Sequence, residues 1–199
     1  MDGTSNYCSG VSADDSRMVA QLLGSTARVI VCDTADGKQV TNFTIPKEIS
    51  EIFPNQTITW TQLSHSGRYL LVYDRVYDLD AKTPKLIWQA HEHSTVNYKS
   101  ALLGDERHVV MRVSDRYEVW DWRKNEKRMT IFLLPQKQWM LFNHETRCWN
   151  GSNFAFRHVE FLFRDADGNE EWVVPFVYES RTGWENAPKK AGLSDLVTN

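Results

Sequence analysis

The segment VYDLDAKTPKLIWQAHEHSTV, residues 76–96, holds a short apolar strand that ends in an aspartate, then a polar turn and a second strand. Two other segments have the same order, VCDTADGKQVTNFTI at residues 31–45 and VWDWRKNEKRMTIFL at residues 119–133. The aspartates that end the first strands are Asp33, Asp78 and Asp121, and they recur roughly every 45 residues. A pattern that recurs three times along the chain, with its features in the same order, predicts a repeat architecture.

A second marker lies upstream of each aspartate. The segments SADDSRMVAQ, SHSGRYLLVY and LGDERHVVMR begin at residues 12, 64 and 103, and they align without gaps as a tight turn followed by an apolar strand. Ser12 with Asp15 also fits a capping box at the start of a helix. The alignment favours a turn and a strand there instead, and it places insertions in loops, where repeats tolerate them.

Apolar runs of four to eight residues, rich in Val, Ile, Tyr and Trp, dominate the chain. Examples are RVIVCD, YLLVYDRVYDLD, HVVMRV and RYEVWDW, each bounded by Gly, Asp, Ser or Pro. Runs of this kind are typical of strands, and helical periodicity is nearly absent. The expected fold class is all-β.

These features resemble the WD-repeat β-propeller family, over roughly residues 7–133. In the copy at residues 89–122, His91 holds the histidine position before the first strand, with Ala90 in place of glycine. Asp105 holds the turn, and Trp120 and Asp121 close the third strand. The resemblance implies a protein-interaction scaffold made of blades, three clear and a fourth degenerate.

The other copies depart from the family pattern. Asp14 is kept in the first copy, but Cys32 replaces the usual Trp, and Ser66 replaces the usual Asp of the second copy. In the family, the His, Asp and Trp of one repeat form a structural hydrogen-bonded network. We therefore expect a structural role for the whole set: His91, Asp105, Trp120, Asp121, Asp33, Asp78 and Asp14.

The repeats stop near Leu134, so we expect blades over residues 1–134 and a last irregular part over residues 135–199. QWMLFNHETRCWNGS predicts one more strand with an irregular turn. EFLFRDADGNEEWVVPF predicts a hairpin that turns at Asp167 and Gly168. The ending resembles the carboxy-terminal segment of some bacterial WD-repeat proteins, some of them kinase-linked, although no kinase motif occurs here.

Composition excludes several classes of function. The 199 residues are 41% hydrophobic and 25% charged, with a net charge of −3. No broad attraction to nucleic acid or to anionic lipid is expected from that charge. No run approaches the roughly 18 apolar residues of a membrane helix, and the first residues lack a signal-peptide pattern, so we expect a cytoplasmic protein. The widely spaced Cys8, Cys32 and Cys148 predict neither a disulfide framework nor a zinc site.

Catalytic and metal-binding patterns are weak. His91 and His93 could supply two metal ligands on one side of a strand, with no third ligand nearby. His144 and Cys148 could pair as base and nucleophile, but no orienting residue or oxyanion motif accompanies them. The carboxylates Asp165, Asp167, Glu170 and Glu171 resemble half of a calcium loop, and a hairpin turn explains them better. We expect no cofactor and no enzyme activity.

Eight tryptophans divide between the repeats and the tail. The first group is expected in blade cores: Trp60, Trp88, Trp120 and Trp122. The second group either seals the last blade or forms a partner-binding face: Trp139, Trp149, Trp172 and Trp184.

The sequence thus favours a non-catalytic scaffold that binds proteins. Two alternatives stay open: a piece of a larger kinase-propeller protein, or a binder of small ligands or carbohydrate through the tail aromatics. A closed propeller needs at least about four blades, so open blade edges would pair with another copy or a larger assembly.

Overall fold

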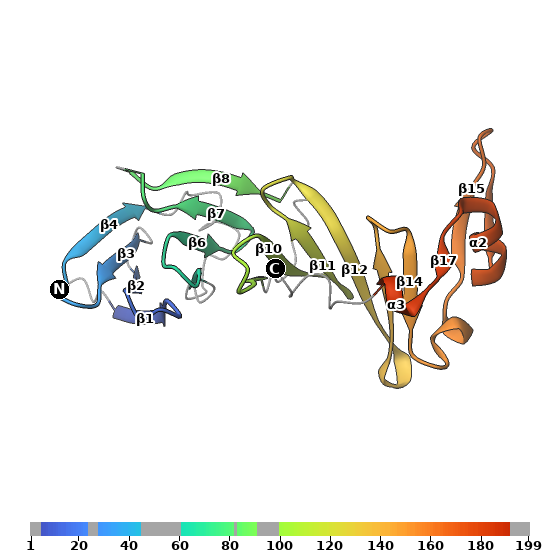
Figure 1. The fold of residues 1–199 in the computed structure, drawn as a ribbon, viewed down its shortest axis with the longest axis horizontal. Coiled ribbons are helices and arrows are strands. Elements are labelled where there is room, and N and C mark those ends of the chain that lie inside the picture. Colours follow the sequence, from blue (N-terminus) through green and yellow to red (C-terminus); the bar gives the residue numbers. More distant parts are fainter. Residues whose placement is uncertain (1–4, 24–27, 45–60, 82, 91–99, 192–199) are drawn as a thin grey trace. The chain divides into compact units, whose positions relative to one another are not determined.

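The computed structural model describes residues 5–23, 28–44, 61–81, 83–90 and 100–191 (Figure 1). The chain forms two compact units. Unit 1 comprises Met1–Arg112 and Asp121–Glu126, and unit 2 comprises Val113–Trp120 and Lys127–Asn199. The division at residue 134 that the sequence suggests stays a prediction.

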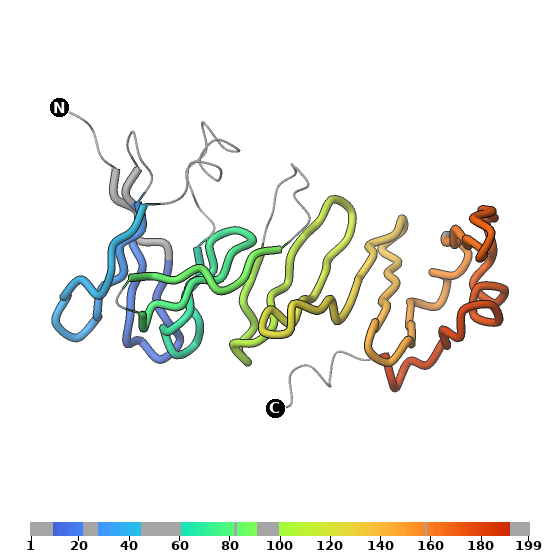
Figure 2. The backbone as a smooth tube through the Cα atoms, turned by 90° about the horizontal axis from the view of Figure 1, so that it is seen from above, coloured from blue at the N-terminus to red at the C-terminus, as the bar shows by residue number. Residues whose placement is uncertain are grey.

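Unit 1 contains two successive four-stranded antiparallel sheets, each a simple meander (Figure 1, Figure 2). The first sheet consists of β1 (Ser5–Val11), β2 (Arg17–Leu23), β3 (Arg28–Asp33) and β4 (Gln39–Thr44). The second sheet consists of β5 (Thr61–Leu63), β6 (Tyr69–Val72), β7 (Arg75–Asp78) and β8 (Lys85–Gln89). These strands confirm the prediction of an all-β fold built from blade-like repeats.

The turns before the apolar strands confirm the gap-free alignment of the three copies. Each turn closes through the same backbone hydrogen bond of 2.8 Å: Ser12 N to Arg17 O, Ser64 N to Tyr69 O, and Leu103 N to His108 O. One residue of each turn lies in the left-handed region of φ: Asp15 at 56°, Gly67 at 68° and Glu106 at 54°. The segment after Ser12 is therefore a turn and a strand, and the alternative helix is wrong.

The core of unit 1 lies between its two sheets. Val19 and Val31 of the first sheet are fully buried, and they pack in one cluster with Leu70 and Val72 of the second sheet. Strand side chains alternate between faces, so the apolar residues at every second position of β2 and β3 share the buried face. Burial of each such side chain stabilises the fold by roughly 1.5–3 kcal/mol.

Further along the chain, β9 (Ser100–Leu102) pairs with β10 (His108–Val113). β11 (Arg116–Asp121) and β12 (Glu126–Leu134) follow in sequence. β13 (Gln138–Asn143) is the extra strand that the sequence predicts. It pairs with β12 in antiparallel orientation, beginning with Leu134 opposite Gln138. The short 3-10 turn η1 (Pro135–Lys137) connects the two strands, so β13 extends the sheet of β12.

The turn after β13 is regular, which the sequence analysis did not expect. Asn143 Oδ1 accepts hydrogen bonds from Glu145 N at 3.0 Å and from Thr146 N at 3.1 Å. β14 (Cys148–Gly151) then pairs with β13 on one side and with the short β17 (Glu185–Asn186) on the other. The asparagine thus forms the kind of turn that the repeats form with an aspartate.

The rest of unit 2 combines a hairpin with short helical segments. The hairpin consists of β15 (Phe161–Arg164) and β16 (Glu170–Val173), and Gly168 has φ 85° in its turn. These features confirm the predicted hairpin. Three helical segments were not predicted: η2 (Ala155–His158), α2 (Pro175–Thr182) and α3 (Pro188–Ala191).

Helix α2 has the local signals that begin and end a helix, but its eight residues are too few to show an amphipathic pattern in the sequence. Pro175 occupies the first turn, where its missing N–H costs nothing. Gly183 ends the helix with φ 73°, and its N–H donates to Glu179 O at 3.0 Å. A helix of eight residues depends on tertiary packing for its stability.

Candidate interaction surface

The aspartates and serines of the upstream turns bind their own backbone. Asp14 Oδ1 accepts hydrogen bonds from Ser12 Oγ at 2.6 Å, Ser16 Oγ at 2.7 Å and Ser16 N at 3.0 Å. These bonds lower the pKa of Asp14 from 3.8 to about 2, and the bond from Ser12 makes the largest contribution. In the third copy, Asp105 Oδ1 accepts from Arg107 N at 2.9 Å and from His108 N at 3.0 Å. Each carboxylate is therefore occupied in holding its turn.

The aspartates that end the third strands serve the following turn in the same way. Asp33 accepts from Ala35 N at 2.8 Å, and Asp78 accepts from Asp80 N at 3.0 Å. Asp121 is fully buried, and its carboxylate accepts from Arg107 Nε at 2.8 Å. Burial opposes ionisation of Asp121, but the bond and charge of Arg107 lower its pKa overall.

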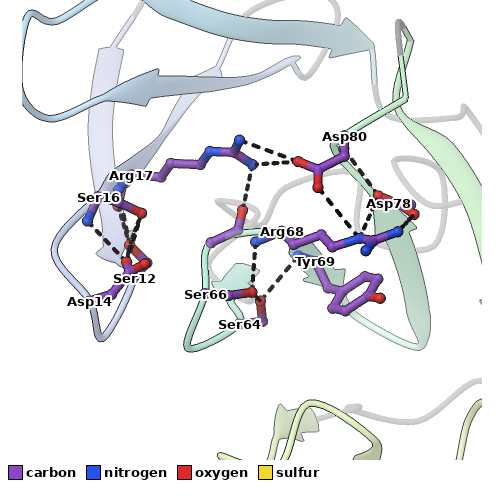
Figure 3. A network of polar contacts seen from close by, with 11 residues as sticks. Ser12, Asp14, Ser16, Arg17, Ser64, Ser66, Arg68, Tyr69, Asp78 and Asp80 are labelled. Carbon is purple, nitrogen blue, oxygen red and sulfur yellow. Dashed lines mark hydrogen bonds and ion pairs between the residues drawn. The ribbon is translucent and has the colours of Figure 1, made fainter.

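Arginine side chains connect these turns within and between the sheets of unit 1 (Figure 3). Arg68 pairs with Asp78 at 2.9 Å inside the second sheet. Arg17 of the first sheet donates to Gly67 O at 2.9 Å and to Asp80 Oδ1 at 3.3 Å in the second sheet. Arg17 thus links the upstream turn of the first sheet to two turns of the second sheet.

The expected network of His91, Asp105 and Trp120 stays a prediction, because His91 lies outside the described residues. Asp105 has His108 as a partner, with 2.5 Å between Oδ2 and Nδ1. Trp120 Nε1 donates to Glu118 Oε2 at 3.0 Å. Sequence reasoning missed both partners, although His108 lies only three residues after Asp105 and Glu118 two residues before Trp120.

Glu118 is a buried carboxylate that no motif indicated. Its side chain is 1% exposed, and its Oε1 is 2.9 Å from Arg116 Nε and 3.3 Å from Lys127 Nζ. Burial opposes ionisation, but these cations and Trp120 lower the pKa of Glu118 overall. The signal that could have found it is a glutamate inside an apolar strand between two basic residues.

The residues considered for catalysis have structural partners. His144 Nε2 is 2.9 Å from Thr130 Oγ1, and the ring lies edge-on against Trp184. Burial lowers the pKa of His144. The Cys148 thiol donates to Thr146 O at 3.4 Å.

The acidic segment at residues 165–171 behaves as a hairpin turn. Asp165 Oδ1 accepts from Asn169 N at 2.8 Å and from Asp167 N at 2.9 Å. Glu170 pairs with Arg164, and Glu171 pairs with Arg181 at 2.6 Å. Within the described ranges, no three His, Cys, Asp or Glu side chains are grouped to hold a metal ion. His91 and His93 lie outside those ranges.

The tail tryptophans divide between sealing and exposure. Trp149 is 6% exposed, and Trp184 packs edge-on against Phe142. Trp172 on β16 is 66% exposed. In the repeats, Trp88 and Trp122 are buried as expected and Trp120 is half-buried, while Trp60 lies outside the described residues.

Large apolar side chains gather on the surface of unit 2 near α2. We call this set the aromatic surface: Phe154, Phe156, Val174 and Phe176, with exposed fractions of 49–78%. The Arg157 guanidinium lies over the rings of both Phe154 and Phe156. A hollow of about 390 Å³ is lined by Phe156, Val174 and Phe176, with Trp149, Pro175, Glu179 and Asn186. Glu179 Oε1 accepts from Trp149 Nε1 and from Asn186 N, both at 2.8 Å, and so fixes two sides of the hollow.

A second hollow in unit 2, of about 660 Å³, lies along β12, β13 and β14. Its lining is mostly aliphatic and includes Ile131, Leu133, Trp139 and Leu141. Apolar hollows of this size suit the side chains of a bound peptide or a small apolar ligand.

Comparison with known proteins gives structural matches alone. No protein-family model matches the sequence, and no curated protein matches it. The chain is similar to the β-propeller domain of Cps50 (Swd1) from Myceliophteria thermophila, with 14% identity, a TM-score of 0.47, and coverage of 71% of this chain and 52% of that one. It is similar to U3-55K with 10% identity, a TM-score of 0.46, and coverage of 76% and 52%.

The chain therefore spans about half the length of each of these structures. The assignment of blade-like repeats rests on the strand pairing and turn geometry of this chain itself. No helix in the described ranges has the length and apolar character to cross a membrane.

Proposed function

We propose that this protein is a non-catalytic interaction module that binds a protein partner through the aromatic surface of unit 2. The observation that carries the proposal is the exposure of that surface, above all Phe176 at 78%. Contiguous exposed apolar side chains on a folded protein mark interaction sites, and aromatic residues dominate the binding energy of interfaces.

The hollow beside α2 gives the surface a place for an anchor. Its volume of about 390 Å³ has room for one or two apolar side chains. The hydrogen bonds from Trp149 and Asn186 to Glu179 hold its wall in place before a partner arrives. A preformed wall lowers the conformational cost of binding.

The polar groups of the repeats support a non-catalytic role. Asp14, Asp105 and Asp121 each accept hydrogen bonds from the turns that they hold. Carboxylates held in this way are committed to structure, whereas a general acid or base must be within reach of a substrate.

The test is a comparison of partners captured by the 199-residue chain and by a Phe176→Glu variant. Leu86→Glu is the matched control, since Leu86 on β8 of unit 1 is 42% exposed. A partner that purifies with the wild type should bind the Phe176→Glu variant at least about tenfold more weakly and the control equally well. Equal binding of a purified partner to both variants would contradict the proposal.

A carbohydrate ligand is the second candidate for the same surface. The hollow combines the ring of Trp149 with the carboxylate of Glu179 and the amide of Asn186, a mixture that suits a sugar. Quenching of tryptophan fluorescence on addition of oligosaccharides, lost in Phe176→Ala, would favour the carbohydrate over the protein partner.

The tail also supports an arrangement in which the module is the carboxy-terminal part of a larger protein. Its ending resembles bacterial WD-repeat proteins, some of them kinase-linked. Further blades or a kinase encoded upstream in the same reading frame would support this arrangement, and an in-frame stop codon directly upstream would contradict it.

A further inference from the structure

The first sheet has an outer face that points away from the second sheet. Four side chains form its centre: Met18 and Ala20 of β2, and Ile30 and Cys32 of β3. Met18 is paired with Cys32 across the strands, and Ala20 with Ile30. All four are half-buried, in contrast to Val19 and its neighbours on the inner face, which are fully buried.

The second sheet shows what the repeat does with the same positions. By the gap-free alignment, Leu70 and Val72 correspond to Met18 and Ala20, and both are 0% exposed. Tyr77 corresponds to Cys32 and is 5% exposed. Leu70, Val72 and Tyr77 are covered by Val19, Val29 and Val31 of the first sheet. The same face is therefore sealed in the second sheet and only half-buried in the first.

We propose that the outer face of the first sheet binds the same face of a second copy of this chain. Large and small side chains alternate on it, because Met18 lies opposite Cys32 and Ala20 lies opposite Ile30. A twofold axis parallel to the strands, between β2 and β3, sets Met18 over the partner's Cys32 and Ala20 over the partner's Ile30. Every large side chain then faces a small one, as a well-packed pair of sheets requires.

The charges on the outer face allow two copies to meet. None of the four central side chains is charged, so self-association brings no like charges together there. Arg28 lies on the same side at the start of β3 and is exposed. The same twofold axis sets the two Arg28 side chains over different strands, at the end of the interface, where water reaches them. Closed interfaces of this kind bury one patch on both copies.

The test is the mass of the 199-residue chain in solution, measured by light scattering over a wide range of concentration. The expected species is a dimer that dissociates on dilution. Ile30→Lys should abolish the dimer, because a buried, unpaired ammonium would lie in the interface. Leu86→Lys, at an exposed site of β8, is the control and should leave the dimer intact.

Alkylation of Cys32, read by peptide mass mapping, gives a second measurement that does not depend on a variant that folds. Its rate should fall several-fold as the dimer forms, whereas in the monomer the half-buried thiol should react. A monomer at every concentration would overturn the proposal and leave the face to a different chain. A dimer that survives Ile30→Lys, or one in which Cys32 reacts as fast as in the monomer, would overturn it as well.

Discussion

Apolar side chains are distributed differently in unit 1 and unit 2. Among the described residues, the large apolar side chains exposed in unit 1 are Val11, Val40 and Leu86. Those exposed in unit 2 are Leu133, Phe154, Phe156, Leu162, Trp172, Val174 and Phe176. In unit 1, each sheet offers its neighbour a matching apolar face, so stacking buries the strands. The hairpin and helix of unit 2 leave apolar surface that its own elements do not cover.

The largest effect should come from removing a core side chain of unit 1. Leu70→Ala leaves a cavity between the sheets and should lower the free energy of unfolding by about 2–5 kcal/mol. Leu133→Ala in unit 2 is the matched control, because Leu133 is 58% exposed, and it should cost about 0.5 kcal/mol or less. Urea denaturation measures both. Equal losses would mean that the two units do not differ in how they bury leucine.

A smaller effect should separate the charged turns of unit 1 from the neutral turn of unit 2. Asp121→Ala removes the buried partner of Arg107 and the turn bonds to the backbone, and should cost about 1–3 kcal/mol. Asn143→Ala removes two comparable turn bonds without an arginine partner. It should cost less, about 1 kcal/mol. If thermal melts rank the two variants in the opposite order, the arginine adds nothing to the turn.

Acid should weaken unit 1 through Asp14. Its pKa is about 2 in the folded chain against 3.8 ordinarily, so the ionised form stabilises the fold above pH 3.8. That contribution is lost as the pH falls through the folded pKa. Asp14→Asn should therefore flatten the fall of the melting temperature below pH 3.8 and leave its value at neutral pH lower. If the melting temperature of the variant falls below pH 3.8 as steeply as that of the wild type, the role of Asp14 in the turn is contradicted.

Asp165 of unit 2 is the comparison for that measurement. Hydrogen bonds from Asn169 lower the pKa of Asp165 as well, and the bond from the Asn169 side chain contributes more than the bond from its backbone. Its hairpin is a local, two-stranded element, so Asp165→Asn should change global melting less than Asp14→Asn does.

The smallest effect should come from the aromatic surface. Phe176→Ser removes a side chain that is 78% exposed and should change the free energy of unfolding by about 0.5 kcal/mol or less. A loss comparable to that of Leu70→Ala would show that Phe176 serves the core of unit 2. A negligible loss would leave binding as the reason for an aromatic side chain there.

The repeats were predictable because their signals are local. The turn of each copy closes within five residues, and Asp33, Asp78 and Asp121 bind backbone groups two or three residues away. Turns of this kind depend on residue types at fixed positions in the sequence, and the strands that follow them show alternating apolar residues. The hairpin at Gly168 was predictable for the same reason.

Other features depended on packing between distant segments. Burial of Trp149 depends on α2, because its indole donates to Glu179 of that helix, and the sequence analysis did not predict the helix. The partners Glu118 for Trp120 and His108 for Asp105 follow from strand geometry that a spacing of residues does not encode.

The repeat and its turns could be predicted from the order of residues, because hydrogen bonds between near neighbours fix them. Which apolar faces are sealed and which stay half-buried follows only from the packing of one sheet on another. Leu70 and Met18 occupy the same place in the repeat pattern, yet Leu70 is buried and Met18 is partly exposed. Burial of a strand side chain depends on the element that packs against its face of the sheet, and the sequence of the strand does not specify that element.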